Sequence, residues 1–458
     1  MQDILIKAVE RMRSLGAEFC DARWQTIEKT MIVVVDGGVR TLSDDRLGGV
    51  CLRARVNGSW GYASGVDPGK DTVLDAANRA VRSAYSGSAT GAPIPERKAR
   101  QAKVRANLKT HPSQVALEDK LALVFDAERS QRVGPQVVNS NAMYREDVRN
   151  NLLCNSLGDE LEWEEVRMRL IGQAISSDGS NTEMYYDGVD GSGGFELIKA
   201  VDVNTFGKHI GEEAVKMLQA QKAPSGPVTC ISDPMISGLL AHEVMGHASE
   251  ADEIVKRRSF LTDAVGKRVA SEGITMVDDG TYASAHGYIP FDDEGTPSSR
   301  TVIIEDGVYK GYMQSLETAA EMGVPPTGNG RAEYYGRRVW VRMTNTFFEK
   351  GDMKLEEMLE DVKHGVLCDK MVSGMEDPVG GGFEAKALRG YLIKDGEVAG
   401  MLRSFTLTGK ALDILQTVDA VGDKVELDGG TCGKGIEDWI PVSSGGPYCR
   451  STIVLGGG

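Results

Sequence analysis

The segment from Asp233 to Asp252 places the strictest demand on how this chain can fold. It reads DPMISGLLAHEVMGHASEAD, and an apolar run leads to His242 and His247, which stand five residues apart. Asp233 followed by Pro234 is typical of a helix start, with an N-cap aspartate and a proline at the first helical position. Residues five apart on a regular α-helix differ by about 140° around the axis. The two imidazoles can therefore share one face only if the helix is irregular.

A π-bulge would supply that irregularity, because one widened turn aligns residues i and i+5. A helix bend or end at Gly246 would have a similar effect. We therefore expect a local departure from α-helical geometry between Val244 and His247. Without it, Glu243 and His247 share a face and His242 points elsewhere.

The residue types in this segment indicate a metal site. Two of the six histidines of the chain flank a turn that also holds Glu243. Imidazoles on a helix beside a glutamate are typical of zinc peptidases, in which two histidines hold the metal and the glutamate moves the proton of the attacking water. The other interpretation, three unrelated polar residues, is harder to reconcile with an otherwise apolar helix.

A catalytic zinc ion usually has three protein ligands, so a third must come from elsewhere in the chain. Cys432 stands in GGTCGKG, where glycines would let a metal approach the thiolate, although a lone cysteine is often only a small buried residue. His286 is as consistent with a structural role as with a ligand. Asp292-Asp293-Glu294 could supply an outer acid or form a turn, and the turn is slightly favoured. Together with Glu250 and Asp252, these residues remain open as candidates on the sequence alone.

Composition excludes several classes of protein. The chain has 458 residues, a net charge of −15 and a pI near 5.1. An acidic balance disfavours both nucleic acid and anionic membranes as partners, since both attract basic surfaces. No apolar run approaches the roughly 20 residues of a membrane-spanning helix. The seven cysteines are scattered and odd in number, and the N-terminus has no signal-like apolar region, so we expect a cytoplasmic protein.

Hydrophobic patterning predicts an α+β chain of two domains. The N-terminal α+β domain, residues 1–222, has helical patterns near 3–15 and 69–85 around strands joined at Asp36-Gly37 and Asn57-Gly58. Residues 86–112, rich in proline, small and basic residues, are predicted to be a linker or a long surface loop.

The second predicted domain, residues 223–458, is β-rich and carries the HExxxH helix. Its turn signals include Asp306-Gly307 and Asp395-Gly396, each between apolar runs that alternate as strands do. We predict hairpins at both positions.

Several motifs of the C-terminal half resemble one known family. They include AHEVMGHASEAD at 241–252, PPTGNGR at 325–331, RMTNTF at 342–347 and TCGKG at 431–435. In this order they resemble the TldD/PmbA family of metallopeptidases, also described as modulators of DNA gyrase. The intact HExxxH places the chain on the TldD side of that family.

The resemblance implies a ligand set and an activity. One zinc ion per active subunit would be held by His242, His247 and Cys432, with Glu243 as the catalytic acid/base. The family's activity implies hydrolysis of unfolded or extended peptides inside a dimeric chamber, as a homodimer or as a heterodimer with a TldE/PmbA-like subunit. Residues 248–252 depart from the family pattern, which leaves open how the helix ends but not which residues hold the metal. Residues 383–405 also depart from it, so the substrate preference does not carry over. The sequence does not decide between endo- and exopeptidase cleavage.

The alternative is a non-catalytic, zinc-stabilised binding or regulatory subunit of a peptidase complex. It predicts a closed site with four protein ligands, in which Glu243 is dispensable. The intact glutamate favours the enzyme.

Overall fold

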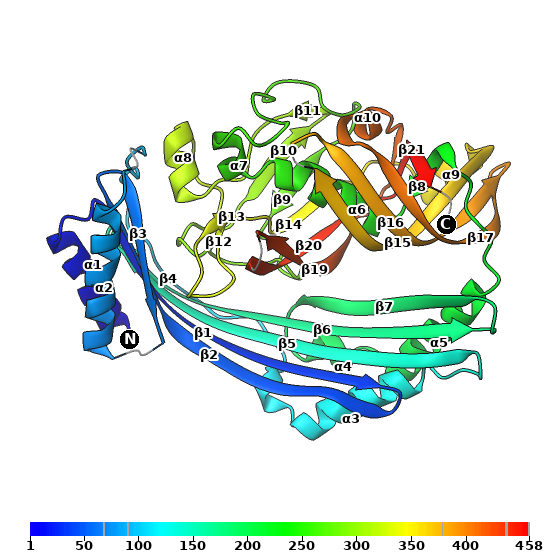
Figure 1. The fold of residues 1–458 in the computed structure, drawn as a ribbon, viewed down its shortest axis with the longest axis horizontal. Helices are drawn as coiled ribbons and strands as arrows, with labels where there is room; N and C mark the ends of the chain where they lie inside the picture. The colour runs from blue at the N-terminus through cyan, green and yellow to red at the C-terminus, as the bar shows by residue number, and fades with distance from the viewer. Residues whose placement is uncertain (67–68, 89–90, 378, 436–437, 457–458) are drawn as a thin grey trace.

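One seven-stranded sheet organises the N-terminal half of the chain (Figure 1). The computed structural model describes residues 1–66, 69–88, 91–377, 379–435 and 438–456. The strand order is β3-β2-β1-β5-β6-β4, and β7 also pairs with β6. The strands of this sheet are β1 (Phe19–Val35), β2 (Gly38–Val56), β3 (Ser59–Gly65), β4 (Gln101–Val104), β5 (Val137–Asn155), β6 (Glu160–Ser177) and β7 (Thr182–Ser192).

Tight turns set the register of this sheet, as the sequence predicts. Asp36 and Gly37 have φ values of 47° and 75°, and Asn57 and Gly58 have 47° and 81°. Two successive positive φ angles are those of the type I′ turn, whose twist matches that of paired strands. Both predicted N-terminal hairpins are therefore confirmed.

Helices cover the outside of the sheet. α1 and α2 pack together over β1, β2 and β3 at one end, and α3 and α5 lie on the face turned away from the C-terminal half (Figure 1). The apolar positions predicted for the first helix, Leu5, Ala8, Val9 and Met12, are buried. The helices are α1 (Gln2–Ser14), α2 (Lys70–Tyr85), η1 (Pro112–Gln114), α3 (Leu117–Arg129), α4 (Glu196–Lys199) and α5 (Val203–Met217).

The predicted linker at 86–112 is only partly irregular. Residues 89 and 90 lie outside the described part of the chain, and Gln101–Val104 forms β4, parallel to the start of β6. The basic side chain of this strand, Lys103, pairs with Glu162 of β6 at 3.0 Å. A polar edge strand of four residues has too few apolar positions for its alternation to be recognised in sequence.

The C-terminal half contains two large sheets. In the first, β15, β16, β17, β21 and β8 pair in a closed ring, with β18 beside β21. Its strands are β8 (Gly226–Ser232), β15 (His364–Asp377), β16 (Gly382–Lys394), β17 (Glu397–Lys410), β18 (Ala420–Val421) and β21 (Cys449–Gly456). The predicted turn at Asp395-Gly396 joins β16 to β17.

The second sheet has the order β11-β10-β9-β14-β20-β19, which leaves β19 at an edge. Its strands are β9 (Met276–Asp279), β10 (Arg300–Glu305), β11 (Val308–Tyr309), β14 (Asn345–Phe348), β19 (Glu426–Lys434) and β20 (Asp438–Gly446), and β12 (Gly330–Arg331) pairs separately with β13 (Trp340–Val341). The predicted hairpin at Asp306-Gly307 joins β10 to β11. The helices of this half are α6 (Pro234–Leu239), η2 (Leu240–Gly246), α7 (Ala251–Val255), α8 (Leu316–Met322), α9 (Leu355–Glu360) and α10 (Ala411–Gln416).

The fold is α+β, as predicted, whereas the division into two domains at residue 222 stays a prediction. One large core cluster, between the two C-terminal sheets, surrounds the α6–η2 segment. None of the helices in the described ranges has the length and apolar character needed to cross a membrane. All seven cysteines are free and buried.

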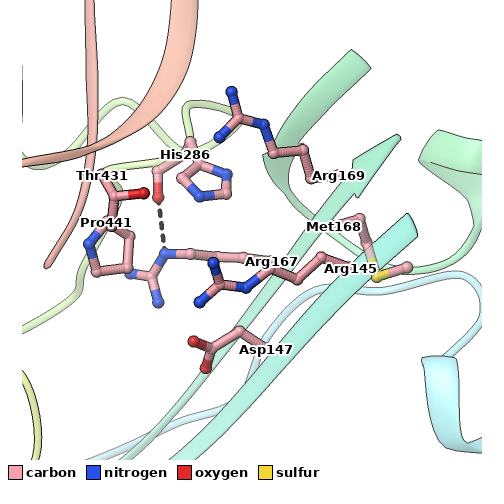
Figure 2. Close-up of a pocket in the computed structure, with 8 residues that line it drawn as sticks. All are labelled: Arg145, Asp147, Arg167, Met168, Arg169, His286, Thr431 and Pro441. Carbon is pink, nitrogen blue, oxygen red and sulfur yellow. Dashed lines mark hydrogen bonds between the residues drawn. The ribbon is translucent and has the colours of Figure 1, made fainter. Parts of the chain in front are cut away.

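Charged side chains join the inner face of the long sheet to the C-terminal half. Arg53 is buried and bonds both Asp21, at 2.9 Å, and Glu294, at 2.8 Å. Arg23 forms an ion pair with Asp293. Farther along the same face, three arginines line a small pocket against the C-terminal half (Figure 2).

Candidate metal centre

The HExxxH segment is a short α-helix that widens into a π-helix. Asp233 caps α6 by accepting a hydrogen bond from the Ile236 amide at 2.8 Å, and Pro234 occupies the first turn. From Leu240 to Gly246 the helix is π-helical. The predicted irregularity is confirmed, and it begins four residues earlier than Val244.

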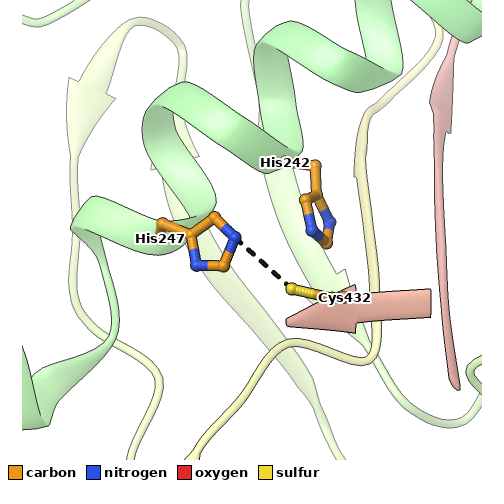
Figure 3. Close-up of side chains that lie close together, drawn as sticks. All are labelled: His242, His247 and Cys432. Atoms are coloured by element: carbon orange, nitrogen blue, oxygen red, sulfur yellow. Dashed lines mark hydrogen bonds between the residues drawn. The ribbon is translucent and has the colours of Figure 1, made fainter. Parts of the chain in front are cut away.

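The widened turn brings His242 and His247 to one face. Their ring centroids lie 5.2 Å apart with an interplanar angle of 86°. Cys432 approaches from β19, and its Sγ lies 3.3 Å from Nε2 of His247 (Figure 3). Ligand atoms of all three side chains lie within 4.8 Å of one another. The three ligands predicted from the family resemblance are thus together in the fold.

Tight packing holds this helix against its surroundings. A Cβ added to Gly238 would lie 2.3 Å from the Gly445 amide nitrogen, so α6 rests directly on the backbone of β20. A Cβ on Gly246 would lie 2.2 Å from Sδ of Met343. These approaches fix the depth of the π-helix relative to the strands, and hence the distance between the histidines and Cys432.

Glu243 lies at the rim of this cluster. Its Oε2 is 3.8 Å from Nε2 of His247, the same nitrogen that faces Cys432. Its side chain is 20% exposed, whereas His242 is 5% exposed. Glu243 can therefore reach both the cluster and solvent, as a group that exchanges protons must.

Glu250 lies behind His247 and is not beside the thiol. Its Oε2 is 3.6 Å from Nδ1 of His247, on the side of the ring opposite Nε2. Lys434 Nζ donates to Glu250 at 2.8 Å, and Nε of Arg342 lies 3.8 Å away from the carboxylate. A carboxylate that accepts from the distal nitrogen of a ligating histidine fixes the tautomer and orientation of the ring. Glu250, one of the open third-ligand candidates, is placed for that role.

Lys434 also binds Asp252. Lys434 Nζ lies 2.8 Å and 2.9 Å from the two carboxylate oxygens of Asp252, so Asp252 is engaged away from the thiol. Arg342 also donates to the carbonyl oxygen of Cys432 at 2.7 Å. Nothing in the sequence marked Arg342 for this position, apart from its place in the RMTNTF motif.

Charge in the cluster is arranged around the thiol. Burial would raise the pKa of Cys432, but His247 and His242 outweigh it and hold the pKa well below its usual value. The pKa of His247 is raised well above its ordinary value, because Cys432 and Glu250 outweigh the desolvation that opposes the charged ring. The thiolate therefore stabilises positive charge on the two imidazole rings. A bound cation would place positive charge at the same position.

The donor set fits a zinc ion. Thiolate sulfur and imidazole nitrogen are preferred zinc ligands, and two such atoms on one tetrahedral ion lie about 3.5 Å apart. The Cys432–His247 distance of 3.3 Å is close to that value. Nδ1 of His242 is buried and has no hydrogen-bond partner among the described residues, as expected of a nitrogen left for a ligand.

The remaining candidates lie elsewhere. His286 lines the arginine pocket of Figure 2 and is not part of the ligand cluster. Asp292 accepts backbone hydrogen bonds from Glu294, Thr296 and Gly330 and closes a turn. Asp293 and Glu294 pair with arginines of the long sheet, so the acidic run serves the contact between the two halves.

Two histidines and a cysteine around one point, with a glutamate at the rim, are the constellation of a metallopeptidase centre. The chain matches models of the PmbA/TldA metallopeptidase domain 1 at residues 20–84, the central domain at 110–222 and the C-terminal domain at 225–454. It therefore belongs to the PmbA/TldD metallopeptidase family.

Curated relatives agree with this assignment, and solved structures share the fold. The chain is 34% identical to a metalloprotease of Methanothermobacter thermautotrophicus, over 96% of each chain, and 23% identical to a zinc metalloprotease TldD homolog of Saccharolobus solfataricus, over 99% of this chain and all of the other. TldE from Thermococcus kodakarensis has the same fold, with a TM-score of 0.78 at 19% identity over 99% of each chain. A Thermotoga maritima protein described as a modulator of a DNA gyrase has a TM-score of 0.82 at 19% identity, again over 99% of each chain.

Proposed function

We propose that this protein is a zinc peptidase that hydrolyses unfolded or extended peptides, with His242, His247 and Cys432 as ligands and Glu243 as acid/base. The observation that carries the proposal is the convergence of the three ligand atoms within 4.8 Å beside a partly exposed glutamate. A site that only stabilised the fold would need a fourth protein ligand and no accessible carboxylate.

The metal supplies one part of the chemistry. When bound, zinc polarises a scissile carbonyl and lowers the pKa of a water molecule beside it. The S and N donors favour zinc, and one relative in the family is named as a zinc metalloprotease. We propose one zinc ion per active subunit.

Side chains of the protein move the proton and hold the ligands in place. Glu243 accepts the proton of the attacking water and returns it to the leaving amine, which its position between the cluster and solvent allows. Glu250 and Lys434 keep His247 from rotating, so that Nε2 stays directed at the cluster.

Strand addition would hold the substrate. β19 is an edge strand, and Gly429 directs its amide to Asp190 and its carbonyl to Arg169, away from β20. In an antiparallel pair outward-facing residues alternate, so Thr431 and Gly433 also present their backbone groups at this edge. An extended peptide could pair there, on both sides of Cys432, with little dependence on its sequence.

A partner subunit would complete the chamber. The fold matches that of TldE from Thermococcus kodakarensis, and relatives in this family carry TldD names. We propose pairing either with a second copy of this chain or with a TldE/PmbA-like chain.

The decisive experiment compares wild type with Glu243→Ala and Cys432→Ser. Zinc content by elemental analysis and cleavage of an unfolded peptide by mass spectrometry are measured on the same samples. We expect Glu243→Ala to keep zinc and lose cleavage, and Cys432→Ser to lose both. A zinc-loaded Glu243→Ala protein with undiminished activity would refute the role of Glu243, and inactive wild type with full zinc content would favour the regulatory-subunit alternative.

A further inference from the structure

A pocket outside the metal cluster holds an excess of positive charge. It lies between the inner face of the long sheet and strands β19 and β20, and Arg145, Arg167, Arg169, His286 and Thr431 are among its lining residues (Figure 2). The chain as a whole is acidic, with a net charge of −15, so a concentration of arginines in one pocket is notable.

Two of the charged groups are paired with neighbours. Arg167 forms an ion pair with Glu165 at 2.8 Å and donates to the His286 carbonyl at 2.7 Å. Asp147, the acidic residue of the pocket, is held by Arg149 at 3.0 Å. These pairs leave Arg145 and Arg169 as the remaining positive charges.

Arg145 and Arg169 stand directly opposite each other on β5 and β6. Like charges at facing positions of an antiparallel pair are destabilising. The Arg145 guanidinium forms no hydrogen bond or ion pair with any described residue. Arg169 donates to the Gly429 carbonyl at 2.9 Å, but its Nε is buried without a partner. Burial raises the pKa of Asp190 and Asp428, and Arg169 opposes that rise at both carboxyls, so Arg169 also faces negative charge.

The imidazole of His286 is a further polar group of the pocket that, within the described ranges, has no hydrogen-bond partner on one of its nitrogens. Its Nδ1 is buried without a hydrogen-bond partner among the described residues. Burial, together with Arg167 and Arg169, lowers the pKa of this imidazole well below its usual value, so the ring is neutral and can donate from one nitrogen. A neutral donor between two guanidinium groups is suited to an oxyanion and unsuited to a cation.

The pocket adjoins the edge of β19. Thr431 precedes Cys432 and lines the pocket. Backbone groups alternate along the strand, so those of Thr431 and Gly433 are directed to the outer edge of β19, where Gly429 already bonds Arg169 and Asp190. A peptide paired with this edge would therefore meet the arginines within about two residues of Thr431, or roughly 7 Å along the strand.

We propose that this pocket binds a carboxylate of the peptide substrate, with Arg145 and Arg169 as its charged donors and His286 as a neutral one. The inference rests on the proposed peptidase function, because it assigns a specificity subsite to the same substrate. The carboxylate can be the chain end or the side chain of an aspartate or glutamate. Both have the same charge and geometry, and guanidinium groups bind either through charge-assisted hydrogen bonds.

The test measures binding separately from cleavage. Three fluorescent peptides are titrated into full-length Glu243→Gln protein by anisotropy. They are a peptide with a free C-terminal acid, the same peptide as its C-terminal amide, and that amide with one residue near the end replaced by glutamate. We expect the plain amide to bind about 10- to 100-fold more weakly than at least one of the others, the range for a hydrogen-bonded charge. The acidic peptide that binds tightly shows whether the carboxylate comes from the chain end or from a side chain.

Arg145→Met in the same background should abolish the preference, while Arg46→Met, a change at an exposed arginine of β2, should leave it intact. Repeating the titrations after chelation of the metal separates this site from a carboxylate on zinc. Equal affinities for all three peptides, or a preference that survives Arg145→Met, would overturn the inference. An acid preference in a protein whose wild type cleaves nothing would instead count against the peptidase proposal and leave the carboxylate site standing.

Discussion

The Nδ1 atom of His247 lies 3.6 Å from Glu250, while Nε2 of the same ring lies 3.3 Å from the Cys432 thiol. The imidazole is thus held from behind by a carboxylate and directed forward at the cluster. Because Glu250 is itself buried and bonded to Lys434, the ring has little freedom to turn. This arrangement predicts that metal affinity depends on a residue that does not touch the metal.

Glu250→Gln should weaken zinc binding by about 10- to 100-fold, the usual effect of removing an outer partner of a ligating histidine. Competition with a chromophoric chelator measures the affinity directly, without reference to catalysis. Glu349→Gln, at a partly exposed surface ion pair with Arg300, is the matched control and should change nothing. Unaltered affinity in Glu250→Gln would mean that packing alone orients His247.

Removing the metal should lower the unfolding temperature of the protein. A ligand that binds only the folded state stabilises it by mass action, by about 2.7 kcal/mol at a concentration 100 times Kd. Calorimetry with chelator and with excess zinc should show this difference in wild type. It should be largely absent in Cys432→Ser, and a Cys432→Ser protein with the full zinc response would remove Cys432 from the ligand set.

Gly238→Ala should destabilise the protein by about 1–3 kcal/mol, the range for overpacking a well-packed site. The added methyl group would overlap the Gly445 backbone, which cannot move aside as a flexible side chain could. Urea unfolding of this variant should be compared with Gly311→Ala, where the added Cβ meets nothing within 4 Å. Equal stability of the two variants would show that α6 can shift away from β20 at no cost.

Glu294→Ala should cost about 3 kcal/mol, because it leaves the buried Arg53 with one of its two carboxylates. Glu305→Ala is the comparison, since Glu305 is 60% exposed in its ion pair with Lys310 and such pairs contribute little. Chemical denaturation of both variants measures the difference. A cost below that of Glu305→Ala would show that the acidic run does not join the two halves.

Asp233 predicts a pH dependence of stability. Burial, and then the nearby Asp369, raise the pKa of this carboxyl from 3.8 to about 7. The folded state therefore keeps a proton that the unfolded chain releases. The contribution of Asp233 to stability is complete below about pH 4 and is lost as the pH rises to about 7, with a slope of up to about 1.4 kcal/mol per unit.

Asp233→Asn tests this slope, because asparagine also caps helices but carries no titrating proton. Unfolding free energies from pH 4 to pH 7 should fall less steeply in Asp233→Asn than in wild type. Parallel curves for the two proteins would show that Asp233 titrates normally.

The sequence by itself determined the elements that depend on neighbouring residues. Turn pairs such as Asn57-Gly58 specify hairpins through backbone angles that few residues adopt, and Asp233-Pro234 specifies where the HExxxH helix begins. The spacing of His242 and His247 also required an irregular helix, since the geometry of a regular one is fixed.

Only the tertiary structure decided which distant groups meet. Cys432 stood among several third-ligand candidates on the residues alone, and the pairing of β19 with β20 places it 3.3 Å from His247. Glu250 behind that histidine and the facing Arg145 and Arg169 depend on helix packing and strand register. Register depends on every contact along a strand, and a shift of one residue turns each side chain to the other face, so no local motif encodes it.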